Sequence, residues 1–128
     1  MRIVGHGIDI QDIRRVERLL ANSHKDWLDG VFSEEEQAGA DAPPIMAQYY
    51  AGRYAAKEAV AKALGTGLTD EVAWLDIQVR RKSSGAPEIE LSGGAAEAAK
   101  TLGITGWHVS LSHSADYAVA SVIAAAET

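Results

Sequence analysis

The sequence predicts an α+β fold: a single domain with a mainly antiparallel sheet and a long central helix. Segments with strand-like alternation lie near both ends of the chain, and segments with helical periodicity lie between them. Short turns join consecutive strands, which favours antiparallel pairing. No linker, repeat or low-complexity tract divides the 128 residues, so we expect one domain over residues 1–128.

The first predicted strand is RIVGHGIDI, Arg2 to Ile10. Side chains alternate between the two faces of a strand, so Asp9 shares its face with Gly5 and Gly7. Glycine inside a strand often marks the close approach of a ligand or of another backbone segment. Asp9 is therefore a candidate functional carboxylate, and a turn-forming aspartate is the equally weighted alternative.

A helix is predicted directly after this strand, with Asp12 as its N-cap. Its apolar residues recur at helical spacing, and this pattern leaves Arg14 and Arg18 on the exposed side. A solvated helix face is the default interpretation of such a pair. The sharper alternative is a docking surface for an acidic protein.

The middle of the chain carries two further helix signals. Ser33 and Glu36 have the spacing of a capping box, so a helix starts in FSEEEQ. Asp41–Pro44 is predicted to be a connector, and a long helix follows from about Ile45 to Leu64. Gly65 is a usual helix stop.

The second half of the chain is predicted to form strands and one short helix. Residues 73–80 alternate, with Leu75 inward and Trp74 outward, and residues 88–91 return as the second strand of a hairpin. A short helix follows Ser92, and two more strands cover residues 107–113 and 117–125. The predicted order is β-α-α-α-β-β-α-β-β.

Composition narrows the class of protein. The formal net charge of −6 argues against a dedicated nucleic-acid binder. The chain has no cysteine, which excludes disulfides and thiolate sites, and it has no apolar run of transmembrane length. The N-terminus lacks the pattern of a signal peptide. We therefore expect a cytoplasmic protein with no membrane contact.

The long helix carries unusual charges among its alanines. Residues four apart stand above one another on a helix, so Arg53 and Lys57 form one column, and Glu58 and Lys62 form the next. A solvated Glu–Lys surface pair is the more common explanation. The functional alternative is a single ionic patch that meets a charged ligand.

The residues around this patch favour the functional alternative. Gly65, Thr66 and Gly67 offer backbone amides and a hydroxyl suited to phosphate oxygens, although no Walker A pattern is present. Asp9 and Glu58 together could hold Mg²⁺, which takes one or two carboxylates and completes its shell with water and phosphate.

The adjacent Ser112 and His113 do not form a hydrolase dyad. Neighbouring residues of a strand point to opposite faces, and the chain has no G-x-S-x-G elbow. His113 is instead expected to donate a hydrogen bond to an anion or to carry a proton, with a structural histidine as the alternative.

Five segments occur in an order that resembles one family: GHGIDIQDIRRVERLL, FSEEEQ, YAGRYAAKEAVAKALGTG, GAP and WHVSLSHSADYAVASVI. The chain is similar from Ile3 to Ile123 to the 4′-phosphopantetheinyl transferases, in their short bacterial holo-[acyl-carrier-protein] synthase class. This resemblance implies Mg²⁺-dependent transfer of phosphopantetheine from coenzyme A to a serine of an apo acyl carrier protein. The second product would be adenosine 3′,5′-bisphosphate.

The resemblance also implies roles for particular residues. It assigns Asp9 and Glu58 to the metal, Lys62 to the pyrophosphate and His113 to the neighbourhood of the phosphates, and these four are the predicted catalytic residues. With the ionic helix and the glycine segment, the predicted coenzyme contacts are Arg53, Lys57, Lys62, Gly65, Thr66, Gly67, Gly85, Pro87 and His113.

The same resemblance implies partners and leaves alternatives. It implies that Arg15 meets the acidic helix of the carrier, and Arg14 and Arg18 are close enough to share that role. It further implies a homotrimer with active sites between subunits. A carrier domain of a polyketide or peptide synthetase is an alternative substrate, and an inactive trimeric coenzyme A-binding or nucleotide-binding module is the alternative function. Three residues depart from the family pattern: His6, Ser33 and Ala86.

Overall fold

The computed structural model describes residues 1–22, 25–40 and 45–127. Along the described chain, the elements are β1 (Arg2–Asp12), α1 (Ile13–Ala21), α2 (Lys25–Val31), α3 (Glu34–Ala38), α4 (Met46–Leu64), the 3-10 helix η1 (Trp74–Asp76), β2 (Ile77–Arg81), β3 (Pro87–Leu91), α5 (Gly93–Thr101), β4 (Gly106–Ser114) and β5 (Tyr117–Ala126). The predicted connector Asp41–Pro44 lies outside the described residues. Among the helices that the structure describes, none is both long and apolar enough to cross a membrane.

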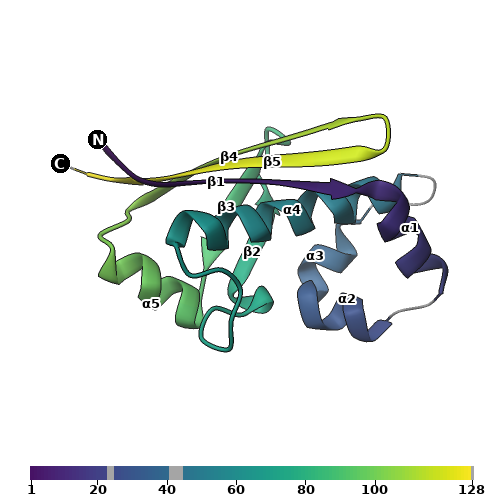
Figure 1. The fold of residues 1–128 in the computed structure, drawn as a ribbon, viewed down its shortest axis with the longest axis horizontal. Helices are drawn as coiled ribbons and strands as arrows, with labels where there is room; N and C mark the ends of the chain where they lie inside the picture. The colour runs from purple at the N-terminus through teal and green to yellow at the C-terminus, as the bar shows by residue number, and fades with distance from the viewer. Residues whose placement is uncertain (23–24, 41–44, 128) are drawn as a thin grey trace.

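Two antiparallel sheets and the central helix form the framework (Figure 1). The larger sheet has the strand order β1-β5-β4, and α4 packs along one of its faces. The hairpin β2-β3 forms the second sheet. Helices α1, α2 and α3 gather at one end of α4, and α5 lies toward the other end (Figure 1). The predicted α+β fold, its antiparallel sheet and its long central helix are confirmed.

The glycines of β1 allow that strand to lie directly against α4. A Cβ atom at Gly7 would overlap the carbonyl oxygen of Ala59, and one at Gly5 would overlap that of Ala63. The space beside these glycines is therefore filled by helix backbone rather than by a ligand. Asp9, on the same face of β1, is brought to the C-terminal half of α4 as a result.

Helix α4 is buried on nearly every side. Its many alanines keep the backbone close to the sheet and to the hairpin, and Ala55, Ala59 and Val60 are fully buried. The helix ends at Gly65, which adopts a left-handed conformation with φ of 78°, as the sequence predicts.

Several local predictions need correction. Helix α2 was not predicted, and residues 74–76 form a 3-10 helix instead of the start of a strand. Leu75 is consequently exposed, whereas Trp74 packs on Tyr54 with their ring centroids 4.6 Å apart. Ser92 stands at the N-cap of α5 but makes no side-chain cap hydrogen bond.

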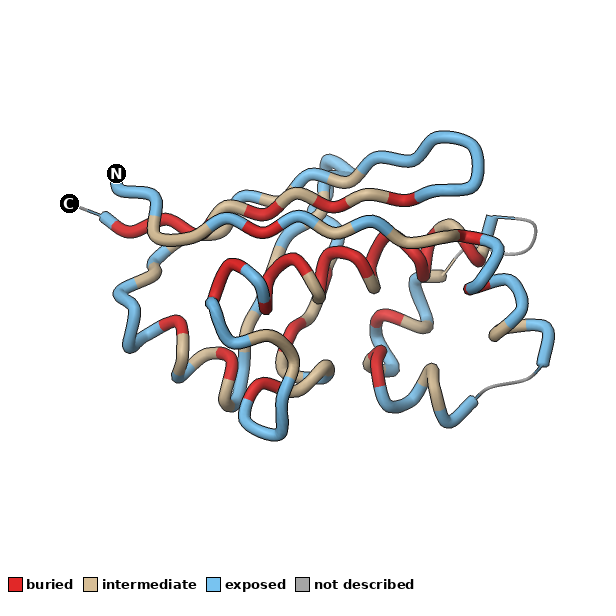
Figure 2. Tube along the Cα trace, viewed as in Figure 1, coloured by how far each residue is buried: buried red, intermediate tan, exposed pale blue. Residues whose placement is uncertain are grey.

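No element of the described chain covers the face of the larger sheet that points away from α4 (Figure 1). Buried and intermediate residues alternate along most of β5, and intermediate and exposed residues alternate along the middle of β4 (Figure 2). Ile8 and Ile10 on this face of β1 are each more than half exposed. Two adjacent, exposed isoleucines on a sheet face are typical of an interaction surface.

Candidate active site

Asp9 and Lys62 form an ion pair between β1 and α4. Lys62 Nζ lies 3.1 Å from Asp9 Oδ1 and donates a 2.9 Å hydrogen bond to the carbonyl oxygen of Ile8. Gln11 Nε2 donates to the other oxygen of Asp9, at 2.7 Å. The Asp9 side chain is only 12% exposed, while that of Lys62 is 50% exposed. The lysine is therefore held near the carboxylate and still reaches solvent.

Glu58 completes this group, which we call the carboxylate site: Asp9, Glu58 and Lys62. Burial raises the pKa of Glu58, the negative charge of Asp9 raises it further, and Lys62 opposes the rise. Within the described part of the chain, the Glu58 carboxylate has no hydrogen bond or ion pair. Two coupled carboxylates served by a single cation leave excess negative charge, and a bound divalent cation would relieve it.

The donor set of the carboxylate site fits Mg²⁺. The structure describes no group of three or more histidine, cysteine, aspartate or glutamate side chains that could enclose a metal. Two carboxylates suit Mg²⁺ because this ion keeps several waters and binds substrate phosphates. A hollow of about 350 Å³ beside Asp9 and Lys62, lined also by Ile8, Ile10 and Val119, leaves room for such ligands.

Lys57 does not belong to the carboxylate site, so the predicted single patch is wrong. Its side chain is fully buried, and its ammonium group is bonded to Glu36 and to the carbonyl oxygens of Val31 and Trp74. The two columns on α4 exist as predicted. They face different surroundings, because α3 and η1 cover the Lys57 side of the helix. Lys57 is therefore not available for the predicted coenzyme contact.

The segment Gly65–Gly67 closes α4. The amide of Gly65 donates to the carbonyl oxygen of Lys62, and those of Thr66 and Gly67 donate to that of Ala61. The Thr66 hydroxyl donates to the carbonyl oxygen of Gly67. These three amides are therefore already bonded in this structure, and the predicted coenzyme contact of Gly65, Thr66 and Gly67 stays a prediction. The segment instead directs the chain away from Lys62 and leaves its ammonium group accessible.

A second cationic cluster lies toward the other end of α4, and we call it the arginine pocket: Tyr49, Arg53, Arg81 and His113. The Arg53 guanidinium stacks over the Tyr49 ring, with Cζ 4.0 Å from the ring centroid. Arg53 is only 8% exposed, and its Nε has no hydrogen-bond partner. Burial lowers the pKa of Arg53, and the charge of Arg81 lowers it further.

Two hollows share Tyr49, Arg53 and Arg81. One, of about 160 Å³, reaches His113, and the other, of about 340 Å³, lies between α3, α4 and β2. The two guanidinium groups repel each other, and both line open space. A phosphate group bound there would offset this repulsion. Gly85 and Pro87 are close to this pocket, since Pro87 pairs with Arg81 in the β2-β3 hairpin.

Arg81 was not among the predicted site residues. The only signal in the sequence that could have indicated it is the basic run Arg80, Arg81 and Lys82. Arg80 forms ion pairs with Glu35 and Glu90, whereas Arg81 forms none within the described residues. Neither Arg81 nor Lys82 is paired within the described residues, and of the two only Arg81 lines the hollows of the arginine pocket.

One chain does not bring the carboxylate site and the arginine pocket together. Arg53 and Lys62 are about 14 Å apart along α4, from the helical rise per residue. Asp9 and His113 lie on β1 and β4, the outer strands of the sheet, and the register offsets them by two residues, so the usual strand spacing and rise put them about 12 Å apart. The predicted catalytic residues thus fall into two groups, with His113 apart from the other three.

The predicted partner-binding arginines are all exposed on α1. Arg14 is already paired with Asp12 at 2.9 Å and with Asp116 at 3.6 Å. Arg15 lies over the Tyr54 ring, with Cζ 5.7 Å from the centroid. Arg18 is exposed near the end of the helix. Arg15 and Arg18 consequently keep more free charge for an acidic partner than Arg14 does.

Known proteins match the chain over nearly its whole length. The family model of the 4′-phosphopantetheinyl transferase superfamily matches residues 5–122. A holo-[acyl-carrier-protein] synthase of Anaeromyxobacter sp. (strain K) is 45% identical over 124 residues, which is 94% of each protein. One of Vibrio vulnificus (strain CMCP6) is 41% identical over 123 residues, 96% of this chain and 98% of the relative.

Solved structures agree with this match. A holo-[acyl-carrier-protein] synthase from Neisseria meningitidis superposes with a TM-score of 0.84 at 31% identity, covering 96% of this chain and 98% of the other. One from Bacillus anthracis, in complex with coenzyme A (3′,5′-ADP), gives 0.82 at 35% identity, covering 99% and 100%. The chain belongs to the 4′-phosphopantetheinyl transferase superfamily, as an enzyme of its holo-[acyl-carrier-protein] synthase class.

Proposed function

We propose that the chain transfers 4′-phosphopantetheine from coenzyme A to a serine hydroxyl of an apo acyl carrier protein, with Mg²⁺, in fatty acid biosynthesis. The products are the holo carrier and adenosine 3′,5′-bisphosphate. The observation that carries this proposal is the carboxylate site, where Asp9 and Glu58 are electrostatically coupled and Lys62 is half exposed. A cytoplasmic location is part of the proposal, and the absence of cysteine is consistent with it.

Asp9 and Glu58 would hold the metal, which supplies positive charge to the pyrophosphate and to the leaving phosphate. Lys62 adds a second positive charge, and its bonds to Asp9 and to the Ile8 carbonyl oxygen fix its direction. Phosphoryl transfer depends mainly on such positioning and charge neutralisation.

The transfer itself breaks one bond and forms one. The serine oxygen attacks the phosphorus that carries pantetheine, and the bond from that phosphorus to the oxygen shared with the 5′-phosphate breaks. The serine proton passes to Glu58, or to a water held by the two carboxylates.

We further propose a homotrimer, in which the arginine pocket of one copy joins the carboxylate site of the next. Two observations support this arrangement. The two groups are separated within one chain, and the sheet exposes Ile8 and Ile10 on a face that no element of the described chain covers. His113, Arg53, Gly85 and Pro87 would then bind the nucleotide part of a coenzyme whose pyrophosphate lies at Lys62 of the neighbouring copy.

Carrier docking is proposed on α1, through Arg15 and Arg18, with Arg14 contributing less. The negative net charge of the chain makes this basic helix a local feature, and an acidic partner would be steered to it. The cognate carrier is proposed to be that of fatty acid synthesis.

Intact mass spectrometry tests the proposed reaction. Apo carrier protein incubated with the chain, coenzyme A and Mg²⁺ should gain the mass of one phosphopantetheine. The gain should disappear with EDTA and return with added Mg²⁺. Binding of coenzyme A without any mass gain on fatty-acid, polyketide or peptide carriers would instead identify an inactive binding module.

A further inference from the structure

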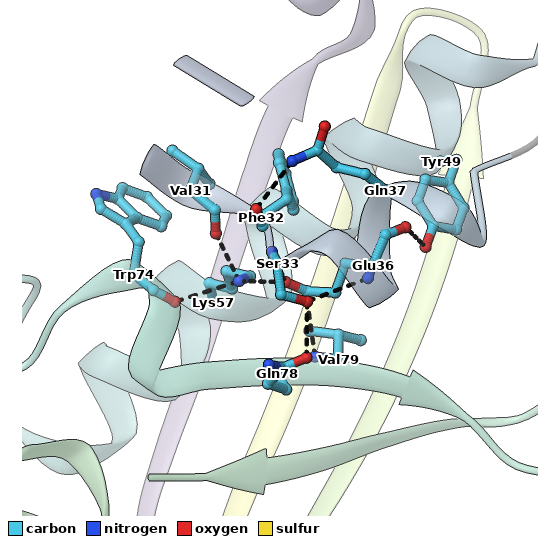
Figure 3. A network of polar contacts seen from close by, with 10 residues as sticks. All are labelled: Val31, Phe32, Ser33, Glu36, Gln37, Tyr49, Lys57, Trp74, Gln78 and Val79. Atoms are coloured by element: carbon cyan, nitrogen blue, oxygen red, sulfur yellow. Dashed lines mark hydrogen bonds and ion pairs between the residues drawn. The ribbon is translucent and has the colours of Figure 1, made fainter. Parts of the chain in front are cut away.

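A fully buried ion pair, Glu36–Lys57, lies between α3 and α4 and is not used by the proposed chemistry. Lys57 Nζ donates to Glu36 Oε1 at 2.8 Å, to the carbonyl oxygen of Val31 at 2.6 Å and to that of Trp74 at 3.2 Å (Figure 3). Glu36 is 3% exposed and Lys57 is 0% exposed. All three protons of the ammonium group are therefore accepted inside the protein.

The Glu36 carboxylate does more than cap its own helix. Its Oε1 accepts from the Ser33 amide at 2.9 Å, which is the capping-box bond. Its Oε2 accepts from the amide of Val79 in β2, also at 2.9 Å (Figure 3). The Tyr49 hydroxyl donates to the main-chain oxygen of Glu36. Glu36 thus ties together α3, α4 and β2.

These three elements are the walls of the larger hollow of the arginine pocket. Glu36 and Val79 line it, Tyr49 and Arg53 come from α4, and Arg81 comes from β2. The distance between the Arg53 and Arg81 guanidinium groups depends on how β2 sits against α4. Glu36 bonds to both elements: its carboxylate accepts hydrogen bonds from Lys57 on α4 and from the Val79 amide on β2.

A cap alone does not require this ion pair. Glutamine also completes a capping box, and a buried ion pair contributes little net stability compared with apolar residues of similar size. Only a carboxylate offers two oxygen acceptors that can serve Ser33, Lys57 and Val79 at once. The bonds of Glu36 are thus better explained if Glu36 fixes the position of β2 than if it only stabilises α3.

We propose that Glu36 is a positioning residue for the nucleotide end of coenzyme A, because it holds Arg81 on β2 at a fixed spacing from Arg53 on α4. Lys57 is the counter-charge that allows the carboxylate to stay buried. This inference rests on the proposed function, in which the arginine pocket binds the nucleotide.

The test is the kinetics of Glu36→Gln, which keeps the shape of the side chain but removes one of the two carboxylate acceptors. The KM for coenzyme A should rise at least fivefold, with kcat within twofold of wild type and the KM for the carrier unchanged. The Kd of adenosine 3′,5′-bisphosphate, measured by calorimetry, should rise by the same factor. If Glu36 served stability only, the variant would have a lower folded fraction, but its KM for coenzyme A and its Kd for adenosine 3′,5′-bisphosphate would equal those of the wild type.

Val122→Ala is the matched control. Val122 is fully buried in β5, away from the arginine pocket, so this variant lowers the melting temperature without touching Glu36. It should keep the wild-type KM for coenzyme A. If Glu36→Gln fails to fold, the double variant Glu36→Gln with Lys57→Met removes both buried charges and undergoes the same two measurements.

A folded Glu36 variant with wild-type KM and Kd would overturn the inference. Failure of the proposed function has a different signature, since the wild-type chain would then show no mass gain on any carrier. If the wild-type chain modifies the carrier and the Glu36 variant keeps the wild-type KM for coenzyme A, only the positioning role of Glu36 is contradicted. The proposed function then stands.

Discussion

Helix α4 carries two lysines that each meet a carboxylate, and the two sites differ in almost every other respect. Lys57 is fully buried and has three partners from three other segments. Lys62 is half exposed, and within the described residues its ammonium group bonds only to Asp9 and to the Ile8 carbonyl oxygen. Glu58, next to Lys57 in sequence, interacts electrostatically with Asp9 and Lys62 of the second site, and within the described residues it forms no hydrogen bond or ion pair.

Similar residues serve structure at one site, and in the proposed function they serve chemistry at the other. A buried charge is tolerated only when its partners satisfy it, so the Glu36–Lys57 pair has no capacity left for a ligand. The carboxylate site has the opposite property, because its negative charge is incompletely balanced and it opens to solvent. The excess negative charge of the two carboxylates can bind a cation, and the hollow beside them leaves room for a pyrophosphate on that cation.

Of the variants that distinguish the two lysine sites, Glu58→Ala should have the largest effect, and the effect should be on activity. We expect turnover to fall by about 10³-fold, because the variant removes the proposed metal ligand and proton acceptor while leaving the core intact. Transfer to the carrier and the circular dichroism spectrum check the two parts of this statement. Glu97→Ala, on the exposed surface of α5, is the control and should retain full activity. An active Glu58→Ala enzyme would remove Glu58 from the site.

Lys57→Met should act on stability instead. We expect the free energy of unfolding to fall by about 3–5 kcal/mol, since Glu36 is left as a buried anion without its counter-charge. Urea denaturation measures the loss. Adding Glu36→Gln to this variant should restore part of it, because both charges are then gone while the Val79 amide loses its acceptor. No recovery in the double variant would mean that the pair is not an isolated unit.

Lys62→Met should leave the fold nearly unchanged. The Lys62–Asp9 pair is half exposed on its lysine side, so the expected loss in the free energy of unfolding is below about 1 kcal/mol. The same urea experiment checks it. A loss as large as that of Lys57→Met would erase the distinction between the two lysines.

The pH dependence of stability should give the smallest effect. The pKa of Glu58 is raised in the folded protein, so its proton stabilises the fold below the unfolded pKa, and this contribution is lost as the pH rises through the folded value. Glu58→Gln should therefore gain about 2 °C in melting temperature relative to the wild type between pH 4 and pH 7, in EDTA. A constant difference across this range would contradict the direction of the shift.

Local signals in the sequence predicted much of the fold. Gly65 ends α4, Ser33 and Glu36 form the capping box, and the β2-β3 hairpin closes as the turn residues predict. Each of these features depends on neighbours within a few residues, which the sequence displays directly. The glycines beside Asp9 correctly indicated the close approach of another segment, but the sequence did not show that this segment is the backbone of α4.

The remaining features depend on contacts between distant segments. Helical spacing put Arg53 and Lys57 in one column, but it could not reveal that α3 and η1 bury that column. Strand alternation predicted that Leu75 points inward. Residues 74–76 form a 3-10 helix instead, and Leu75 is exposed. Arg81 belongs to a pocket only because β2 packs beside α4. Such tertiary coverage has no periodic signature in the sequence.

The central claim is the division of labour between Lys57 and Lys62, and the most direct measurement is kcat for Lys57→Met and Lys62→Met. Both would be measured by intact mass of the carrier, at saturating coenzyme A and normalised to the folded fraction. The account predicts a kcat within twofold of wild type for Lys57→Met and a loss of about 10²-fold for Lys62→Met. Equal losses in the two variants, or a fully active Lys62→Met enzyme, would contradict it.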